Sequence, residues 1–281
     1  MNNDDLVRLV AQNESYLVYK APRDERVLEA LRRVDRAKFI PLRVMDLVTV
    51  VEPAYIGAMH NLLCTLSGDD PYLLVTASAS RTLPKLCRQM IDSVKELDVP
   101  IRYTRAYNDE PVDIGYGQTC SSSSTVALMA DVLELQEGMS VLEIGSGCGY
   151  HAAVTTELVG AEGRVVTMER IPQLVGLARR NLAEQFQNGA SRRVHVVYGD
   201  GSLGLPEEGP FDRIYITAGV QLDLGRFNPD ILGGQLKPGG ILMYPEKEGD
   251  LIKEPYGAGG KRINRIRYGG FHFVPLHGEN S

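Results

Sequence analysis

No run of apolar residues in this sequence approaches the roughly 18 that a membrane-spanning helix needs, so we expect no membrane partner. The first residues, Met1 to Asp5, are acidic and lead into no apolar core, which does not fit a secretory signal. The formal net charge is −6, so no general excess of cations is present to attract nucleic acid. The one cationic stretch, Lys261 to Arg267, fits a solvated strand or loop face better than a nucleic-acid site.

Cysteine is scarce, and its spacing matches no common motif. The cysteines form no C-x-x-C pair and have no histidines at zinc-site spacing; they are Cys64, Cys87, Cys120 and Cys148. Unpaired thiols of this kind are typical of a reducing compartment. We therefore expect a cytoplasmic protein with reduced cysteines and no metal site. The sequence indicates no oligomeric state.

The composition is that of an ordinary folded protein. Of 281 residues, 43% are apolar and 23% are charged, and no repeat or long low-complexity tract interrupts the chain. This length allows one large domain, or one domain with a small accessory unit. Apolar residues recur at helical spacing from Arg23 to Lys38, and Pro41 is expected to end that helix.

Strands and helices alternate along most of the remaining chain. Residues 72–77, 83–97 and 99–103 read as strand, helix and strand. Beyond residue 122 the pattern predicts helix 125–135, strand 140–144, helix 150–159, strand 164–168, helix 172–187, and strands 194–198, 211–217 and 240–244. This order predicts an α/β fold with a doubly wound, mostly parallel sheet covered on both faces. Ligands in such folds bind beyond the carboxyl ends of the strands.

A glycine-rich turn joins the strand at 140–144 to the helix that follows. Gly145, Gly147 and Gly149 form G-x-G-x-G, which differs from the G-x-G-x-x-G of a dinucleotide site, and no Lys-Ser/Thr follows as in a phosphate-binding loop. Glycine allows positive φ and close approach of a ligand to the backbone. Glu143 precedes the glycines, where a carboxylate would repel pyrophosphate and favour a cationic ligand such as S-adenosylmethionine. A merely tight turn is the alternative.

Two more acidic residues end the next two strands. Glu169 follows the strand after the glycine loop, where a carboxylate in a doubly wound fold accepts hydrogen bonds from both ribose hydroxyls. Asp200, with Gly201 after it, can meet an adenine amino group, although Asp-Gly is also a common turn pair. Each acid alone could be a solvated charge. Together with Glu143 they surround one glycine loop, which favours a cofactor site.

Several motifs occur in an order typical of one enzyme family. The most distinctive is Ile114 to Thr119, with Ser121 one residue further on. The others are Val27 to Pro41, Val141 to Tyr150, Glu169 to Pro172, Gly199 to Gly201, Phe211 to Ile214, Leu236 to Gly240 and Phe273 to Leu276. On these motifs the sequence resembles the protein-L-isoaspartate O-methyltransferase family.

The resemblance implies a Rossmann-like fold that binds S-adenosylmethionine and methylates the α-carboxylate of L-isoaspartyl residues. Repair of aged proteins through a methyl ester and a succinimide would follow, on a protein or peptide substrate carrying isoaspartate or aspartate. By resemblance, Ser121 donates a hydrogen bond that orients the substrate carboxylate, and Thr119 and Gln118 shape its loop. The implied cofactor-binding residues are Glu143, Gly145, Ser146, Gly147, Gly149, Glu169, Arg170, Asp200, Gly201 and Thr217. The implied substrate wall is Ile114, Val274, Pro275 and Leu276, with an ordinary C-terminal strand as the alternative for the last three.

Three departures from the family pattern leave alternatives open. Cys120 to Ser124 stand where the family has Ile-Ser-Ala-Pro-His, so these serines either cap the next helix or remodel the pocket. Thr217 to Gln221 stand where it has Thr-Ala-Ala-Ala-Pro. Roughly fifty extra residues lie between Pro41 and Ala106, and an insertion this long is usually functional or a small subdomain. We therefore expect an N-terminal helical segment at 1–49, an inserted α/β accessory unit at 50–104 and the catalytic, cofactor-binding domain at 105–281.

The same departures keep two other functions open. A carboxyl methyltransferase that acts on an aspartate of a dedicated precursor peptide, forming an aspartimide, fits the altered serine run and the insertion. A cofactor-binding interaction protein without catalysis fits the loss of the family's histidine. His151, beside the glycine loop, is expected to pack at the start of its helix and not to act in catalysis.

Overall fold

The computed structural model describes residues 2–12, 24–43, 74–75, 106–187, 193–220, 227–246 and 248–276. The elements predicted at 83–97 and 99–103 lie outside the described residues, as does all of the expected unit at 50–104 except residues 74–75. Strands β1 (Leu42–Arg43) and β2 (Leu74–Val75) form a short antiparallel ladder. The expected domain boundaries therefore stay predictions.

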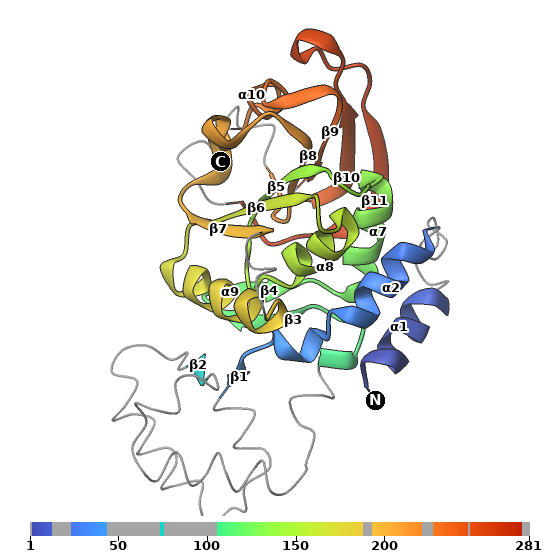
Figure 1. Cartoon of the computed structure of the whole chain (residues 1–281), viewed down its shortest axis with the longest axis vertical. Helices are drawn as coiled ribbons and strands as arrows, with labels where there is room; N and C mark the ends of the chain where they lie inside the picture. The colour runs from blue at the N-terminus through green and yellow to red at the C-terminus, as the bar shows by residue number, and fades with distance from the viewer. Residues whose placement is uncertain are drawn as a thin grey trace, which may run out of the picture.

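A seven-stranded sheet forms the centre of the described structure (Figure 1). Its strand order is β11-β10-β9-β8-β5-β6-β7. The strands are β5 (Ser140–Ile144), β6 (Arg164–Glu169), β7 (Val194–Tyr198), β8 (Phe211–Ile216), β9 (Leu236–Pro245), β10 (Glu248–Pro255) and β11 (Ile266–His272). Strands β5 to β9 pair in parallel, and β10 and β11 add an antiparallel edge. The predicted mostly parallel sheet is confirmed.

Alternate residues along the strands face two separate cores, because successive side chains of a strand point to opposite faces. On β5, Val141 lies in the larger core, and Leu142 and Ile144 lie in the smaller one. The helices that contribute to the larger core are α1 (Asn3–Gln12), α2 (Glu25–Arg33), α7 (Ser123–Leu133), α8 (Tyr150–Val159) and α9 (Pro172–Gln185). The smaller core is closed by loop residues and by α10 (Pro229–Gly233). The two faces of the sheet are therefore covered unequally.

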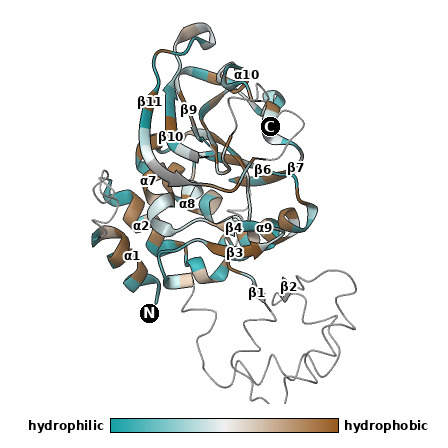
Figure 2. Cartoon of the chain, turned by 180° about the vertical axis from the view of Figure 1, so that it is seen from behind, coloured by the Kyte–Doolittle hydropathy of each residue, from teal (hydrophilic) through white to brown (hydrophobic). Residues whose placement is uncertain are grey.

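The N-terminal helices are amphipathic and pack on the larger core. Leu6, Val7 and Val10 form the buried face of α1, which contacts α2 and α7. Figure 2 shows α1 and α2 with apolar stretches beside hydrophilic ones, as expected of helices with one buried face. Helix α1 is not among the elements that the sequence predicts.

Local capping explains two shifted helix boundaries. The helix predicted at 23–38 is split into α2 and a 3₁₀ turn at Arg36–Lys38, because the Asp35 side chain accepts from the Ala37 N–H and starts a new turn. Helix α7 begins two residues before Thr125, because the Ser122 hydroxyl accepts from the Thr125 N–H at 3.2 Å.

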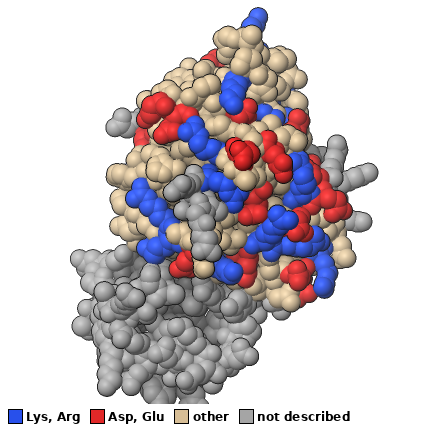
Figure 3. Space-filling model, viewed as in Figure 1, with Lys and Arg blue, Asp and Glu red and all other residues tan. Residues whose placement is uncertain are grey.

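The surface of the described residues carries both charges. The stretch from Lys261 to Arg267 is exposed, and Arg262 and Arg265 pair with the buried carboxylate of Glu254. On the face shown in Figure 3, cationic and anionic side chains are interspersed. No helix among the described residues is long and apolar enough to cross a membrane. Those residues also hold no group of three or more His, Cys, Asp or Glu placed to bind a metal.

Candidate functional site

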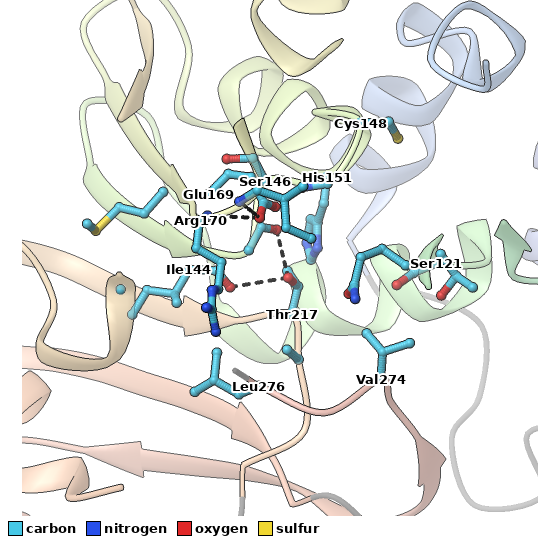
Figure 4. A pocket seen from close by; sticks show the side chains of 18 of the residues that line it. Ser121, Ile144, Ser146, Cys148, His151, Glu169, Arg170, Thr217, Val274 and Leu276 are labelled. Carbon is cyan, nitrogen blue, oxygen red and sulfur yellow. Dashed lines mark hydrogen bonds between the residues drawn. The ribbon is translucent and has the colours of Figure 1, made fainter. Parts of the chain in front are cut away.

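A cavity lies at the carboxyl ends of β5, β6 and β8, where the topology predicts a ligand (Figure 4). It brings together most of the residues that the sequence assigns to the site. These are Gln118, Thr119, Ser121, Gly145, Ser146, Gly147, Glu169, Arg170, Gly201, Thr217, Val274, Pro275 and Leu276. Four of the assigned residues do not line it: Ile114, Glu143, Gly149 and Asp200.

The glycine loop forms one side of the cavity with a backbone that requires glycine. Gly145, Gly147 and Gly149 have φ angles of 101°, 52° and 87°, which residues with a Cβ rarely adopt. A Cβ at Gly145 would lie 2.3 Å from Thr217 Oγ1. The Thr217 hydroxyl donates to the Gly145 carbonyl at 2.7 Å, so the segment after β8 holds the loop in place.

Glu169 ends β6 and faces the cavity while three backbone groups hold its carboxylate. Oε2 accepts from the Gly147 N–H at 3.0 Å, and Oε1 accepts from the N–H groups of Arg170 and Ile171 at 2.9 and 3.0 Å. A carboxylate has about four acceptor sites, so about one remains for a ligand. The expected contact of Glu169 with the ribose hydroxyls stays a prediction.

Glu143 is placed differently from the expectation. Its side chain is fully buried, away from the cavity surface, and its carboxyl group accepts from Tyr215 Oη at 3.0 Å and from the Thr167 hydroxyl. Thr167 bonds in turn to Ser146, and Tyr215 to Thr155. Burial raises the pKa of Glu143 to about 8, so the group is mostly protonated at neutral pH. It supports the glycine loop from the buried side and does not line the cavity.

Asp200 forms the turn that an Asp-Gly pair favours, and its expected adenine contact stays a prediction. Its carboxylate accepts from the Ser202 N–H at 2.9 Å and caps the 3₁₀ turn at Gly201–Leu203. Asp200 is exposed and outside the cavity lining, whereas the Gly201 backbone lines it. An Asp-Gly pair commonly forms such a turn.

Ile114 and Gly149 lie behind the cavity wall. A Cβ on Gly147 would lie 3.2 Å from Ile114 Cδ1, so this side chain packs under the glycine loop. A Cβ on Gly149 would lie 3.1 Å from Leu182 Cγ, so this glycine permits close packing of the loop on α9. Both residues act on the site through packing.

A tight hairpin presents Ser121 to the cavity. Strands β3 (Val112–Gly115) and β4 (Gln118–Cys120) pair antiparallel through Tyr116 and Gly117, whose φ angles are 56° and 68°. Positive φ at both turn residues is typical of two-residue hairpins. Ser121 follows β4, and no residue in the described part of the chain hydrogen-bonds to its hydroxyl. That hydroxyl is therefore available to a ligand.

The unusual serine run builds the start of α7. Ser122 is the N-cap, the Ser123 hydroxyl bonds to Tyr150 Oη at 2.9 Å, and the Ser124 N–H donates to Asp109 at 2.8 Å. None of these three serines lines the cavity. Of the two interpretations of the run, helix capping fits the structure better than a remodelled pocket.

The C-terminal segment closes the opposite side. The Gly219 N–H donates to the Val274 carbonyl at 2.7 Å, and the Leu276 N–H donates to the Gly219 carbonyl at 2.8 Å. This pairing brings Val274 and Leu276 to the cavity from the far end of the chain (Figure 4). Their apolar side chains cover part of its mouth.

Sequence reasoning missed several lining residues. Ile144, Met168 and Ile171 add apolar surface beside the glycine loop and Glu169. Their positions directly before and after the predicted polar residues are the only signal that could have identified them. His151 packs against Tyr215, with ring centroids 4.6 Å apart, as its expected packing role requires. It also lines the cavity, and burial lowers its pKa to about 3.

Comparisons with known proteins agree on one family. The family model described as protein-L-isoaspartate(D-aspartate) O-methyltransferase (PCMT) matches residues 82–280. The chain is 47% identical over 193 residues to protein-L-isoaspartate O-methyltransferase 1 of Archaeoglobus fulgidus, which covers 66% of this chain and 82% of that protein. It is 46% identical over 179 residues to protein-L-isoaspartate O-methyltransferase of Methanopyrus kandleri, which covers 62% of this chain and 75% of that protein.

Solved structures share the fold. A protein-L-isoaspartate O-methyltransferase matches with a TM-score of 0.65 and 22% identity over 99% of this chain and 67% of its own. A Plasmodium falciparum protein, described as a putative protein-L-isoaspartate O-methyltransferase in complex with S-adenosyl-L-homocysteine, matches with a TM-score of 0.63 and 18% identity over 99% of both chains.

The buried Glu143 predicts an unusual dependence of stability on pH. Its pKa is about 8 when folded and near 4.3 in an unfolded chain, so between these values the folded state binds the extra proton. Its favourable contribution is complete below about pH 4 and is lost as pH rises through about 8. We expect Glu143→Gln, which stays neutral, to gain stability relative to the wild type as pH rises from 5 to 9. Urea unfolding at several pH values measures this difference.

Glu184→Gln is the matched control, because Glu184 is an exposed residue of α9. Its stability relative to the wild type should change little with pH. A constant stability difference for Glu143→Gln over the same range would contradict the raised pKa.

Proposed function

The chain belongs to the protein-L-isoaspartate(D-aspartate) O-methyltransferase family. We propose that it methylates L-isoaspartyl α-carboxylates in the cavity at the carboxyl ends of β5, β6 and β8. It is an S-adenosylmethionine-dependent carboxyl O-methyltransferase. The observation that carries the site assignment is that the glycine loop, Glu169 and the unengaged Ser121 hydroxyl line one cavity. Cofactor and substrate groups therefore have adjoining places.

The residues present fit S-adenosylmethionine. The left-handed glycine loop keeps side chains away from the ligand, and Glu169 retains an acceptor site at the cavity. Ile144, Met168 and Ile171 provide the apolar surface that a flat base needs. The residues proposed to hold the cofactor are Gly145, Ser146, Gly147, Glu169, Arg170, Gly201 and Thr217.

The protein's part in the reaction is orientation and exclusion of water. When bound, the cofactor supplies an electrophilic methyl group. A substrate carboxylate is already ionised at neutral pH, so the chain needs no general base. The Ser121 hydroxyl donates a hydrogen bond that fixes the nucleophilic oxygen, and such positioning supplies several kcal/mol. Val274 and Leu276 shield the reacting groups from solvent.

The biological role is proposed on the same basis. We propose that the ester product closes to a succinimide and reopens partly to normal aspartate, which repairs aged proteins in the cytoplasm. The substrate is a protein or peptide carrying isoaspartate, and the segment at 50–104 would tune which sequences are accepted.

Methyl transfer to matched peptides tests the function. We expect base-labile label from methyl-labelled S-adenosylmethionine on an isoaspartyl peptide and none on its aspartyl twin. Label on neither peptide, with cofactor binding confirmed by calorimetry, would overturn general repair. It would favour a dedicated precursor peptide or an interaction protein without catalysis.

Removal of the Ser121 hydroxyl should slow the reaction without affecting the cofactor. One oriented hydrogen bond contributes on the order of 1–3 kcal/mol, so we expect Ser121→Ala to lower kcat about ten-fold or more. Ser122→Ala is the matched control, because the Ser122 hydroxyl caps α7 outside the cavity. It should cost about 1 kcal/mol of stability and leave kcat nearly unchanged. Equal rates for Ser121→Ala and the wild type would remove Ser121 from the mechanism.

Glu169 should act on the cofactor instead. Glu169→Gln keeps the shape but removes the charge and one acceptor, so we expect the Kd for S-adenosylmethionine to rise about ten-fold. The Kd measured by calorimetry, with Glu184→Gln as the control, checks this. An unchanged Kd would show that the carboxylate only anchors the loop.

A further inference from the structure

One polar side chain at the cavity is buried without a hydrogen-bond partner. His151 lies in the first turn of α8, is 7% exposed and lines the cavity (Figure 4). Its ring packs against that of Tyr215, and neither of its nitrogens hydrogen-bonds to any residue that the structure describes. A buried polar group without a partner is costly, so a ligand that pairs with this imidazole gains affinity.

The two ring nitrogens of His151 have different surroundings. Burial lowers the pKa of His151 to about 3, so the imidazole is neutral and carries a single N–H donor. Nε2 is enclosed and meets no acceptor among the described residues, whereas Nδ1 is not enclosed. Because a buried N–H without an acceptor is rare and costly, this difference favours the proton on Nδ1. From there it can be donated to a ligand in the cavity.

The start of α8 favours an anion at the same place. The helix has ten residues, its N-cap is Gly149, and no side chain in the described part of the chain caps it. The unpaired N–H groups of a helix's first turn, together with the positive end of its dipole, attract a carboxylate. The N–H of His151 adds a directed donor beside them, and hydrogen bonds to a carboxylate are among the stronger ones.

The strand order indicates which carboxylate would bind there. Strand β5 lies between β6 and β8 in the sheet. Glu169, which is expected to contact the ribose, ends β6, whereas His151 packs on Tyr215 of β8. With the ribose at Glu169, the amino-acid end of the cofactor would cross the glycine loop toward His151. Ser121, which is proposed to orient the substrate, is presented by the separate β3–β4 hairpin.

We propose that His151 donates a hydrogen bond to the carboxylate of S-adenosylmethionine and, together with the N-terminus of α8, selects for the amino-acid end of the cofactor. This inference rests on the proposed place of the cofactor in the cavity. The role is in cofactor binding, and His151 takes no proton from the substrate. It requires that ligands with the carboxylate bind more tightly than ligands without it.

Two ligands that differ only in the carboxylate test this contact. S-adenosylmethionine and decarboxylated S-adenosylmethionine share the nucleoside, the sulfonium and the ammonium group. Calorimetry on the full chain measures both Kd values, and in the wild type we expect S-adenosylmethionine to bind at least about ten-fold more tightly. Equal Kd values in the wild type would overturn the proposal without any variant.

The variant His151→Leu should remove the preference. We expect it to raise the Kd of S-adenosylmethionine about ten-fold and to leave the Kd of the decarboxylated ligand nearly unchanged. An unchanged Kd for the decarboxylated ligand also shows that the variant is folded with an intact cavity. His151→Asn places an amide N–H close to the position of Nδ1, so we expect it to keep most of the preference.

The matched control is His195→Leu, because His195 is an exposed residue of β7 outside the cavity lining. It should change neither Kd. An equal rise in both Kd values for His151→Leu would overturn the proposal and leave His151 a packing residue. An unchanged Kd for S-adenosylmethionine with a raised KM for the isoaspartyl peptide would also overturn it, because His151 would then bind the substrate carboxylate.

Failure of the proposed function would look different. A wild-type protein that shows the expected pair of Kd values but labels no isoaspartyl peptide would count against the proposed function alone, because binding is measured without methyl transfer.

Discussion

A carboxyl group without access to water lies at the centre of the described structure, and the glycine loop depends on it. Glu143 connects β5 to Thr167 of β6 and to Tyr215 of β8. The chain of hydrogen bonds continues to Ser146 in the loop and to Thr155 in α8. A buried polar group that loses its hydrogen-bond partner is energetically costly, so each member of this network fixes the position of its neighbours. The loop thus has one position relative to three strands and a helix.

The substrate side of the cavity depends on a second buried group from a distant part of the chain. Arg36 lies 85 residues before Ser121 and donates to its carbonyl. The same guanidinium holds the carbonyls of Ala106, Asn108 and Glu110. The N-terminal helical segment therefore does more than cover the sheet, because it fixes the loop that presents the Ser121 hydroxyl.

Much of the fold could be predicted from the sequence, because each parallel strand and helix carries its own period of apolar residues. Ser140–Ile144, Tyr150–Val159 and Val194–Tyr198 coincide with the predicted elements. Side-chain direction could not be predicted in the same way. The alternation along β5 places Glu143 on the same face of the sheet as Val141. Only the three-dimensional structure shows that the helices packed on this face exclude water from it.

The other differences have similar causes. At Asp200 the Asp-Gly pair forms the turn that was the alternative interpretation, and the adenine contact stays a prediction. The buried role of Arg36 depends on five carbonyls brought together by tertiary structure. No sequence pattern marks such an arginine, since its partners are backbone atoms and carry no residue identity.

Under the proposed function, one cavity has to serve a cationic and an anionic group. An ionised Glu143 under the loop would repel an incoming carboxylate, and in the low dielectric of the core that repulsion would be strong. Burial keeps it largely protonated. The acidic group on the cavity surface beside the loop, Glu169, is held at the end of β6 by three backbone N–H groups. Ser121 arrives on a separate hairpin with a neutral donor. Separation of the acid from the hydroxyl on different elements therefore allows opposite charges to bind side by side.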